Sequence, residues 1–402
     1  MRTLVVATEF PWPLNSGSRL RLANTVEALS LCGPTELFSA VSESRSDFAS
    51  PPSTLALERL ECIAIDDRPP GPRDVARSII QPTIPFEMPV RARAIVRSAL
   101  RRFVAGEYDL IWFFQVRAWV LAGELSLAPD VVDIDDLEDE KILARSALPI
   151  REGASRGPLR RGVARLWTAE DVRRWRRLHR LVARRSTATV VCSELDARRS
   201  GLPGVRVVPN GYPSPERPVG RLAVSSPPIV MFQGTLRYPP NADAARYLVE
   251  EVGPRLRALV PDAQIRLVGV APPALTDLDD PPTVTLTGRV TDITDELSRA
   301  DIILIPLRYG SGTRVKILEA FAHRIPVVST SIGAEGLEVR PGTHLLVADD
   351  PDGLATACAR LLGDDALRHA LIEKAHDLFV ERYRASVIQE EIGILARDLA
   401  TR

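Results

Sequence analysis

Paired cysteines, an excess of one charge and long hydrophobic runs are all missing from this chain of 402 residues. The four cysteines form no CxxC pair, which argues against a zinc framework or a disulfide scaffold. Basic and acidic side chains balance at 52 each, so the basic excess of a nucleic-acid-binding protein is absent. No apolar run approaches the roughly 20 residues of a membrane span, and the apolar run at residues 4–7 is too short for a signal peptide. We therefore expect a cytoplasmic protein.

Short apolar runs rich in β-branched residues alternate with helical patterns along the whole chain. This alternation predicts parallel sheets covered by helices on both faces, in an α/β protein with two doubly wound, Rossmann-like domains. The stretch 211–228 is dense in Pro, Gly and Ser and predicts a linker between domains 1–210 and 229–383. The expected strands are 4–7, 111–114, 131–134, 188–192 and 205–208, then 229–232, 265–269, 283–286, 302–305, 327–329 and 345–347.

Residues 301–337 form the most informative segment. A buried strand is expected to end near Leu307, followed by a glycine-containing loop and a helix from about Thr313, with Val315, Leu318 and Ala322 on its buried stripe. Exposed amides at a helix start favour an anion. Lys316 and Glu319 share one helix face, which suits a phosphate and a ribose with two vicinal hydroxyls. An exposed salt bridge between these two side chains is the alternative.

The segment around Gly17 is a second candidate for ligand contact. A strand ends near Ala7, a proline-rich loop passes through Gly17, and a helix is expected from about Arg19. Such a loop meets the ligand in open α/β sheets. One glycine matches neither a dinucleotide fingerprint nor a P-loop, so an ordinary strand–helix connection is equally compatible.

The second half resembles the nucleotide-sugar-binding domain of retaining glycosyltransferases of family 4, which have the GT-B fold. The resemblance spans about residues 205–383 and is looser in the first half. It implies a donor domain at 229–383, an acceptor-binding first domain, and a C-terminal helix, 384–402, that packs back on the first domain. An oligomerisation helix is the alternative for residues 384–402. The motifs that carry it are VVPNGY (207–212), FQGTLRYPPNADA (232–244), RLVGV (266–270), LTGRVTDI (286–293), PLRYGSGTRVKILEAFA (306–322), PVVST (326–330) and GAEGL (333–337).

The resemblance also assigns roles to residues of these motifs. Glu319 matches the second acid of the family's E-x7-E motif and binds ribose, while Ser311 replaces the first acid, which normally faces the donor sugar. Gly312 and Thr313 offer amides to that sugar. The remaining implied contacts are Lys316 and Arg308 on the diphosphate, Gly234 beside the donor phosphate, and Arg289 and Val290 beside the base.

The resemblance implies a hexosyltransferase. Such an enzyme moves a sugar from a nucleoside diphosphate sugar to an acceptor hydroxyl, with retention of the anomeric configuration. The implied partners are that donor and a small-molecule, glycan or lipid-linked acceptor, with no cofactor, no metal and no nucleic acid. Fixed cations and helix amides stabilise the departing diphosphate, and that phosphate can take the acceptor's proton. A non-catalytic nucleotide-sugar-binding protein and a nucleotide-sugar epimerase on the same fold are the alternatives.

Two other segments carry competing signals. Asp133 and Asp135 form a DxD pattern, which suits a divalent cation, an acidic helix start, or a cleft-lining acceptor contact. The family often has a histidine where Asp135 stands, so Asp135 is a candidate for orienting the sugar or the acceptor. Residues 151–185 are rich in arginine, which predicts a solvated helix, or peripheral contact with the inner membrane face as the alternative.

Overall fold

The computed structural model describes residues 1–43, 48–66, 68, 81–123, 125, 127–146, 158–310 and 314–401, without the side chains of 158–161 and 163. The chain divides into two compact units, each with its own sheet and core. Unit 1 contains Met1–Pro209 and Ile388–Arg402, and unit 2 contains Asn210–Val387. None of the described helices combines the length and apolar character that a membrane span requires.

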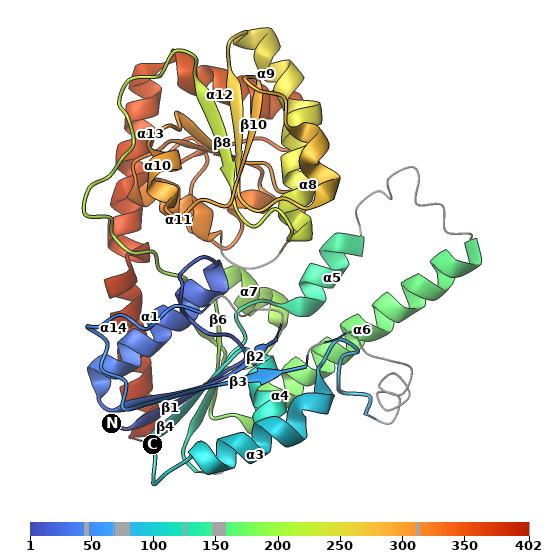
Figure 1. Ribbon diagram of the computed structural model, residues 1–402, viewed down its shortest axis with the longest axis vertical. Coiled ribbons are helices and arrows are strands. Elements are labelled where there is room, and N and C mark those ends of the chain that lie inside the picture. The colour runs from blue at the N-terminus through green and yellow to red at the C-terminus, as the bar shows by residue number, and fades with distance from the viewer. Residues whose placement is uncertain are drawn as a thin grey trace. The chain divides into compact units, whose positions relative to one another are not determined.

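Unit 1 is built on a parallel sheet of seven strands in the order β3-β2-β1-β4-β5-β6-β7 (Figure 1). The strands β1, β4, β5 and β6 are buried apolar runs, as expected for a sheet covered on both faces. The strands are β1 (Thr3–Ala7), β2 (Thr35–Ser42), β3 (Arg59–Ile65), β4 (Leu110–Phe114), β5 (Asp130–Asp133), β6 (Ala188–Val191) and β7 (Arg206–Val207). The helices are α1 (Gly17–Cys32), α3 (Arg93–Phe103), α4 (Val116–Ala122), α5 (Glu138–Ser146), α6 (Pro158–Arg185) and α7 (Glu194–Ser200), with a short 3₁₀ turn at Val90–Ala92.

Two strands of unit 1, β2 and β3, were not among those expected from the apolar runs. The strand β2 contains Glu36, whose buried carboxylate accepts hydrogen bonds from Arg2 at 2.7 Å and from the Tyr108 hydroxyl at 2.9 Å. The strand β3 lies at the edge of the sheet and alternates between exposed and partly buried residues. Neither strand is therefore a continuous apolar run, although the pairing of both is parallel.

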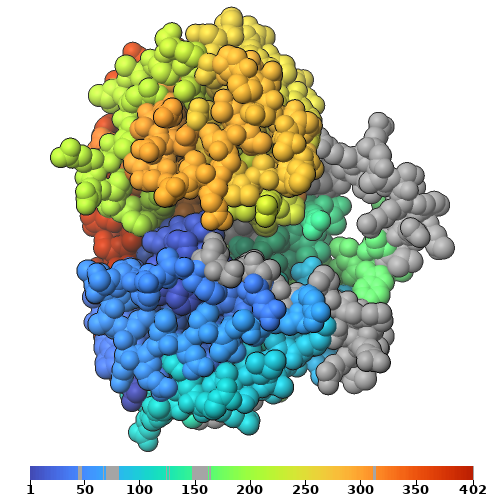
Figure 2. Space-filling view, in the orientation of Figure 1, coloured from blue at the N-terminus to red at the C-terminus, as the bar shows by residue number. Residues whose placement is uncertain are grey.

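Unit 2 is built on a parallel sheet of six strands in the order β10-β9-β8-β11-β12-β13. On the face drawn in Figure 2, the atoms of unit 2 form a closely packed surface. The strands are β8 (Ile229–Gln233), β9 (Gln264–Val268), β10 (Val284–Gly288), β11 (Ile302–Ile305), β12 (Val327–Ser329) and β13 (Leu346–Val347). The helices are α8 (Pro239–Tyr247), a π-helical turn (Leu248–Val252), α9 (Gly253–Leu259), α10 (Ile293–Leu297), α11 (Val315–Ala322), α12 (Pro351–Gly363), α13 (Asp365–Leu378) and a π-helical turn (Phe379–Tyr383), with 3₁₀ turns at Pro273–Leu278 and Ile332–Ala334.

The last helix, α14 (Ala385–Ala400), begins in unit 2 and continues into unit 1. Its buried residues Ile388, Ile392, Ala396 and Leu399 recur at helical spacing and join one core of unit 1. Together with α1 it covers one face of the seven-stranded sheet, and α3, α4 and α6 cover the other (Figure 1).

The stretch 211–228 belongs to unit 2 and is bonded to it at several points. Tyr212 pairs with Arg384, and the Gly220 amide donates a 2.8 Å hydrogen bond to the carbonyl of His323. Ser225 donates to the carboxylate of Asp301, and its own amide bonds the same carboxylate at 2.9 Å. The proline-rich stretch that the sequence predicts as a linker is therefore a segment that packs against unit 2.

Candidate functional site

The polar residues of unit 2 gather where its strand order reverses. The strands β8 and β11 are neighbours, and the chain continues from them towards opposite edges of the sheet. Such a reversal leaves a crevice beyond the carboxyl ends of the two strands, where open α/β sheets bind ligands. The strand β8 ends at Gln233, and the loop after β11 leads into α11.

Lys316, in the first turn of α11, reaches this position. Its ammonium donates a 2.8 Å hydrogen bond to Asn241 Oδ1 and lies 4.9 Å from the centroid of the Phe232 ring. The pKa of Lys316 is lowered to about 7, mainly by burial and also by the charge of Arg314, while Glu319 opposes the shift. A bound anion would favour the charged form of this ammonium.

Gly234 makes room for this ammonium. A Cβ at position 234 would lie 2.9 Å from Lys316 Nζ and 2.9 Å from Asn241 Nδ2. The backbone also has φ +143°, a conformation that residues with side chains rarely adopt. Only glycine therefore fits between the end of β8 and Lys316.

Glu319 lies one turn further along α11 and takes partners other than Lys316. Its Oε1 accepts a 2.7 Å hydrogen bond from the Tyr212 hydroxyl, and its Oε2 accepts a 3.2 Å bond from Gln233 Nε2. Burial raises the pKa of Glu319, whereas these two bonds and Lys316 lower it. The sequence left open an exposed salt bridge between Lys316 and Glu319. In the structure, each of these side chains instead bonds other neighbours.

The other expected contacts of unit 2 fall at different places. Arg308 donates a bidentate pair of bonds to Asp243, at 2.9 and 2.5 Å, and lies over the Tyr247 ring. Arg289 and Val290 follow β10 directly, the first exposed and the second partly buried. Ser311, Gly312 and Thr313 lie outside the described residues.

The helix expected from about Thr313 begins at Val315, because Arg314 has ψ +79° and is not helical. Val315 is only partly buried, and the buried stripe is instead formed mainly by Ile317, Leu318 and Phe321. The expected stripe was therefore wrong at Val315. The shift leaves Lys316 at the second position of the helix, where its side chain can turn back towards Gly234.

Unit 1 has a corresponding reversal between β1 and β4. Gly17 is the first residue of α1, and Ser16 caps the helix by accepting a hydrogen bond from the Arg19 amide at 3.2 Å. The first turns of α1 bury two arginines, Arg19 and Arg21, which sequence analysis did not single out.

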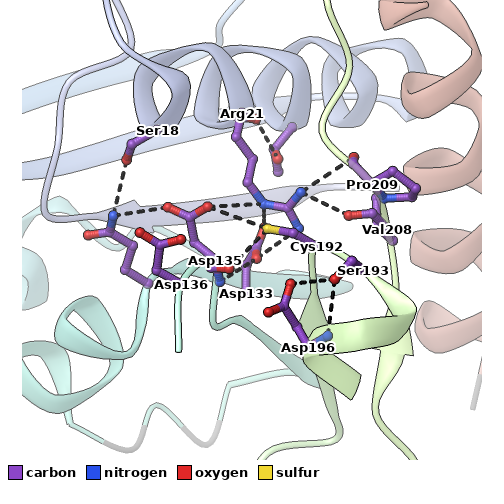
Figure 3. Close-up of polar contacts among 12 residues, drawn as sticks. Ser18, Arg21, Asp133, Asp135, Asp136, Cys192, Ser193, Asp196, Val208 and Pro209 are labelled. Atoms are coloured by element: carbon purple, nitrogen blue, oxygen red, sulfur yellow. Dashed lines mark hydrogen bonds and ion pairs between the residues drawn. The ribbon is translucent and has the colours of Figure 1, made fainter. Parts of the chain in front are cut away.

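Arg21 occupies the space beside the expected DxD pattern (Figure 3). Its guanidinium donates two 2.9 Å bonds to the carboxylate of Asp133 and a further 2.9 Å bond to the Val208 carbonyl. Arg21 is 4% exposed and Asp133 is 1% exposed, so this ion pair is closed off from solvent. Both carboxylate oxygens of Asp133 therefore accept hydrogen bonds from the buried Arg21.

Asp135 follows β5 in an unusual backbone conformation. It has φ +60°, and Gln115, which follows the neighbouring β4, has φ +69°. Gln115 Nε2 contacts Asp135 Oδ2 at 3.3 Å and the Ser18 hydroxyl at 3.1 Å. The pKa of Asp135 is raised to about 7, mainly by burial and also by the charge of Asp136, while Arg21 opposes the shift. Strained residues at adjacent strand ends are typical of binding sites.

Among the residues that the structure describes, no group of three or more His, Cys, Asp or Glu side chains is arranged to hold a metal ion. The pairing of Asp133 with Arg21 explains why this pattern does not form such a group: the guanidinium stands where a cation would stand.

Tyr212, Gln233 and Asn241 were missed as site residues. Each lies inside a quoted motif, but each bonds a residue of α11 that is 75 to 107 positions away in the sequence. Gln233 carried a usable signal, because it is the last residue of a strand and directly precedes Gly234.

Part of unit 2 is similar to known proteins. Residues 227–364 match the model of the family described as glycosyl transferases group 1. Over 122 residues the chain is 34% identical to an exopolysaccharide phosphotransferase of Streptomyces coelicolor, covering 30% of this chain and 13% of that protein. The chain spans between 13% and 34% of the length of the curated relatives it matches.

Solved structures match the whole chain at low sequence identity. Sucrose-phosphate synthase of Thermosynechococcus elongatus superimposes with a TM-score of 0.67 at 17% identity, over 99% of this chain and 98% of that one. HepE of Anabaena, in complex with UDP and glucose, superimposes with a TM-score of 0.63 at 16% identity, over 99% and 100%. The chain therefore has the GT-B fold, and its residues 227–364 match the family of glycosyl transferases group 1.

Proposed function

We propose that the protein transfers a hexosyl group from a nucleoside diphosphate sugar to an acceptor hydroxyl, with retention of configuration. The observation that carries the proposal is the placement of Lys316 against Gly234 at the strand reversal of unit 2. A partly buried ammonium with a pKa of about 7 has lost much of its hydration, and it donates a hydrogen bond to a neutral acceptor, Asn241 Oδ1. A diphosphate would supply the missing negative charge.

In this proposal Lys316 binds the diphosphate and stabilises the charge that develops on it as the sugar leaves. Arg314 lies close enough to Lys316 to lower its pKa and adds a second positive charge at the same place. Glu319 binds the ribose, and Arg289 and Val290 lie beside the base. Arg308 is the least favoured phosphate contact, because Asp243 already holds its guanidinium.

Ser311 stands where the family has its first acid, so the donor sugar is left with backbone groups of Gly312 and Thr313 as the proposed contacts. In unit 1, Gly17 begins α1 at the strand reversal, and Asp135 is the proposed contact for the sugar or the acceptor. With a pKa of about 7, Asp135 can donate or accept a hydrogen bond near neutral pH. The departing phosphate can take the acceptor's proton, so no metal and no dedicated base are required.

The acceptor is proposed to be a small molecule, a glycan or a lipid-linked sugar. Peripheral membrane contact would suit a lipid-linked acceptor, and the outer side of α6 offers a basic surface for it. Arg173, Arg177 and Arg180 are exposed there, whereas Trp175 is buried against the sheet. Glu170 lies within 4 Å of two of these arginines, which reduces the free charge.

The test begins with thermal unfolding in the presence of UDP, GDP, ADP or dTDP, each with magnesium and with EDTA. One nucleotide should raise the unfolding temperature equally under both conditions. The matching nucleotide sugar is then incubated with glycan and lipid-linked acceptors, and the anomeric configuration of the product is read by NMR. Glu319→Ala should weaken nucleotide binding by about 1–3 kcal/mol.

The three candidate functions give different results in this assay. A transferase releases nucleoside diphosphate only when an acceptor is present, whereas an epimerase changes the free donor without one. A binding protein does neither. Absence of any nucleotide-induced stabilisation, or stabilisation that requires magnesium, would contradict the proposed donor site.

A further inference from the structure

The carboxylate of Glu319 has one protein donor on each oxygen. The Tyr212 hydroxyl bonds Oε1 at 2.7 Å, and Gln233 Nε2 bonds Oε2 at 3.2 Å. A carboxylate has about four lone-pair sites, so it is oriented by these two bonds and can still accept bonds from a ligand. The ligand donors that fit are hydroxyl or amide groups.

Gln233 carries an unused acceptor at the same place. Its side chain belongs to a residue that is only 3% exposed, and Oε1 accepts a hydrogen bond from no residue that the structure describes. The orientation of the amide is determined by Glu319, because the opposite orientation would place two oxygens against each other. A buried carbonyl without a donor is costly, so this oxygen indicates a partner that is supplied from outside the chain.

Tyr212 is held in place by backbone bonds on both sides. Its amide donates to the Tyr383 carbonyl at 2.9 Å, and its carbonyl accepts from the Ala385 amide at 2.9 Å. These bonds form a parallel bridge with Arg384. The backbone that carries the Tyr212 side chain is therefore fixed by the protein itself, and its hydroxyl bonds Glu319 without a bound ligand.

We propose that Gln233 is a ligand-binding residue whose Oε1 accepts a hydrogen bond from the donor ribose, and that Tyr212 is a positioning residue for Glu319, so that the site selects ribonucleoside over deoxyribonucleoside diphosphate sugars. This inference rests on the proposed function. A ribose presents two vicinal hydroxyl donors, and Glu319 with Gln233 presents two adjacent acceptors. A ribose lacking one hydroxyl leaves a buried acceptor without a donor, which sites of this kind discriminate strongly.

The inference is tested by calorimetric titration of the full chain with UDP, GDP, ADP and dTDP, followed by the 2′-deoxy and 3′-deoxy forms of the ribonucleotide that binds most tightly. Each deoxy form should bind the wild type about 10- to 100-fold more weakly than the ribonucleotide. A wild type that binds the ribonucleotide and both deoxy forms equally, or that binds only dTDP, overturns the inference.

Gln233→Leu and Gln233→Met remove the free oxygen and retain bulk. In both variants the penalty for one of the two deoxy forms should fall to within about threefold, because the acceptor that read that hydroxyl is gone. Unchanged penalties for both forms would show that Gln233 does not contact the ribose. If neither variant folds, as judged by circular dichroism, the wild-type ratios alone still decide the selectivity.

Tyr212→Phe tests the positioning role, and Tyr383→Phe is its matched control. The Tyr383 hydroxyl is also buried in unit 2, but it bonds the Glu338 amide at 2.7 Å. Tyr212→Phe should weaken ribonucleotide binding about tenfold and reduce the deoxy penalties, whereas Tyr383→Phe should lower only thermal stability. Equal deoxy penalties in wild type and Tyr212→Phe would leave Tyr212 with a purely structural role and overturn that part.

Failure of the inference and failure of the proposed function are distinguishable. Glu319→Gln serves as the reference, because it changes the ribose-binding acid itself. If it weakens nucleotide binding while Gln233 and Tyr212 variants do not, the inference is wrong and the donor site remains. If no nucleotide binds the wild type, both are wrong.

Discussion

At the scale of single residues, the unit 2 site depends on Lys316, whose charged form is disfavoured in the folded protein. The pKa of Lys316 falls from 10.5 to about 7, mainly because burial disfavours its charged form. Below pH 10.5 the unfolded chain carries this charge, whereas the folded chain carries it fully only below about pH 7. Lys316 therefore lowers the free energy of unfolding across that range, as ligand-binding groups often do.

Replacing this lysine should stabilise the free protein and remove its response to nucleotide. Lys316→Met removes the charge and keeps a side chain of similar length. It is expected to raise the free energy of unfolding at pH 7 by about 0.5–2 kcal/mol. Thermal unfolding with and without the nucleotide that stabilises the wild type measures both effects. Lys374→Met, at an exposed lysine of the same unit, is the control and should change neither. A Lys316→Met variant that is still stabilised by nucleotide would exclude the lysine from the binding site.

Nucleotide affinity should depend on pH through the same lysine. A bound diphosphate favours the ammonium form, so affinity is greatest at and below pH 7 and falls as pH rises through the pKa of the free protein, by up to about tenfold per pH unit. The charged groups beside Lys316 are Arg314, which lowers its pKa, and Glu319, which raises it. Titration calorimetry between pH 7 and pH 9 measures the slope, and Lys316→Met should have none. A flat profile in the wild type would contradict the role of Lys316.

At the scale of elements, α14 begins in unit 2 and packs its buried face into a core of unit 1. Ile388, Ile392, Ala396 and Leu399 lie in the core that also contains residues of β1, β4 and α1. The helix is thus part of the hydrophobic core of unit 1, although it is almost 400 residues from β1 along the chain. Its apolar spacing was visible in the sequence, but the core that it joins was not.

A pair of substitutions on α14 should separate burial from helix content. Ile392 is 2% exposed, whereas Ile394, two residues later, is 56% exposed. Ile392→Asp is expected to lower the free energy of unfolding of unit 1 by about 2–5 kcal/mol, because it removes core contacts and buries a charge. Ile394→Asp should stay within about 0.5 kcal/mol. Chemical denaturation of both variants is the measurement, and equal effects would show that the helix does not join this core in solution.

At the scale of the whole molecule, each unit has its own sheet and its own hydrophobic core. Units of this kind can unfold separately, because each buries most of its apolar surface internally. All five tryptophans lie within residues 1–209, so tryptophan fluorescence reports unit 1. The proposed donor site belongs to unit 2.

Nucleotide binding should therefore shift one unfolding transition and leave the other in place. At about 100 times its dissociation constant, the nucleotide that binds would stabilise unit 2 by roughly 2.7 kcal/mol. Circular dichroism follows both units and should report the shift, whereas tryptophan fluorescence should not. EDTA should leave the result unchanged. A shift of equal size in both signals would show that the two units unfold as one.

Much of the fold followed from local sequence, because a buried parallel strand is a short apolar run wherever it occurs. The sequence did not predict β2 and β3, because neither strand is a continuous apolar run and both depend on contacts with distant residues or on their place in the sheet. Glu36 is tolerated in β2 because Arg2 and Tyr108 bond its carboxylate, and β3 is an edge strand. A single residue type cannot reveal such compensation, since the compensating group is distant in the chain.

The sequence by itself determined the two α/β units, the strand–loop–helix segment with Lys316 and Glu319, and the absence of paired cysteines. Only the tertiary structure decided which groups these residues bond. Tyr212 lies 107 positions from Glu319, and Arg21 lies 112 positions from Asp133. Local pattern sets the element in which a side chain lies, because periodicity is a short-range property. The hydrogen-bond partner, and with it the pKa, depends on which strand ends the sheet order brings together.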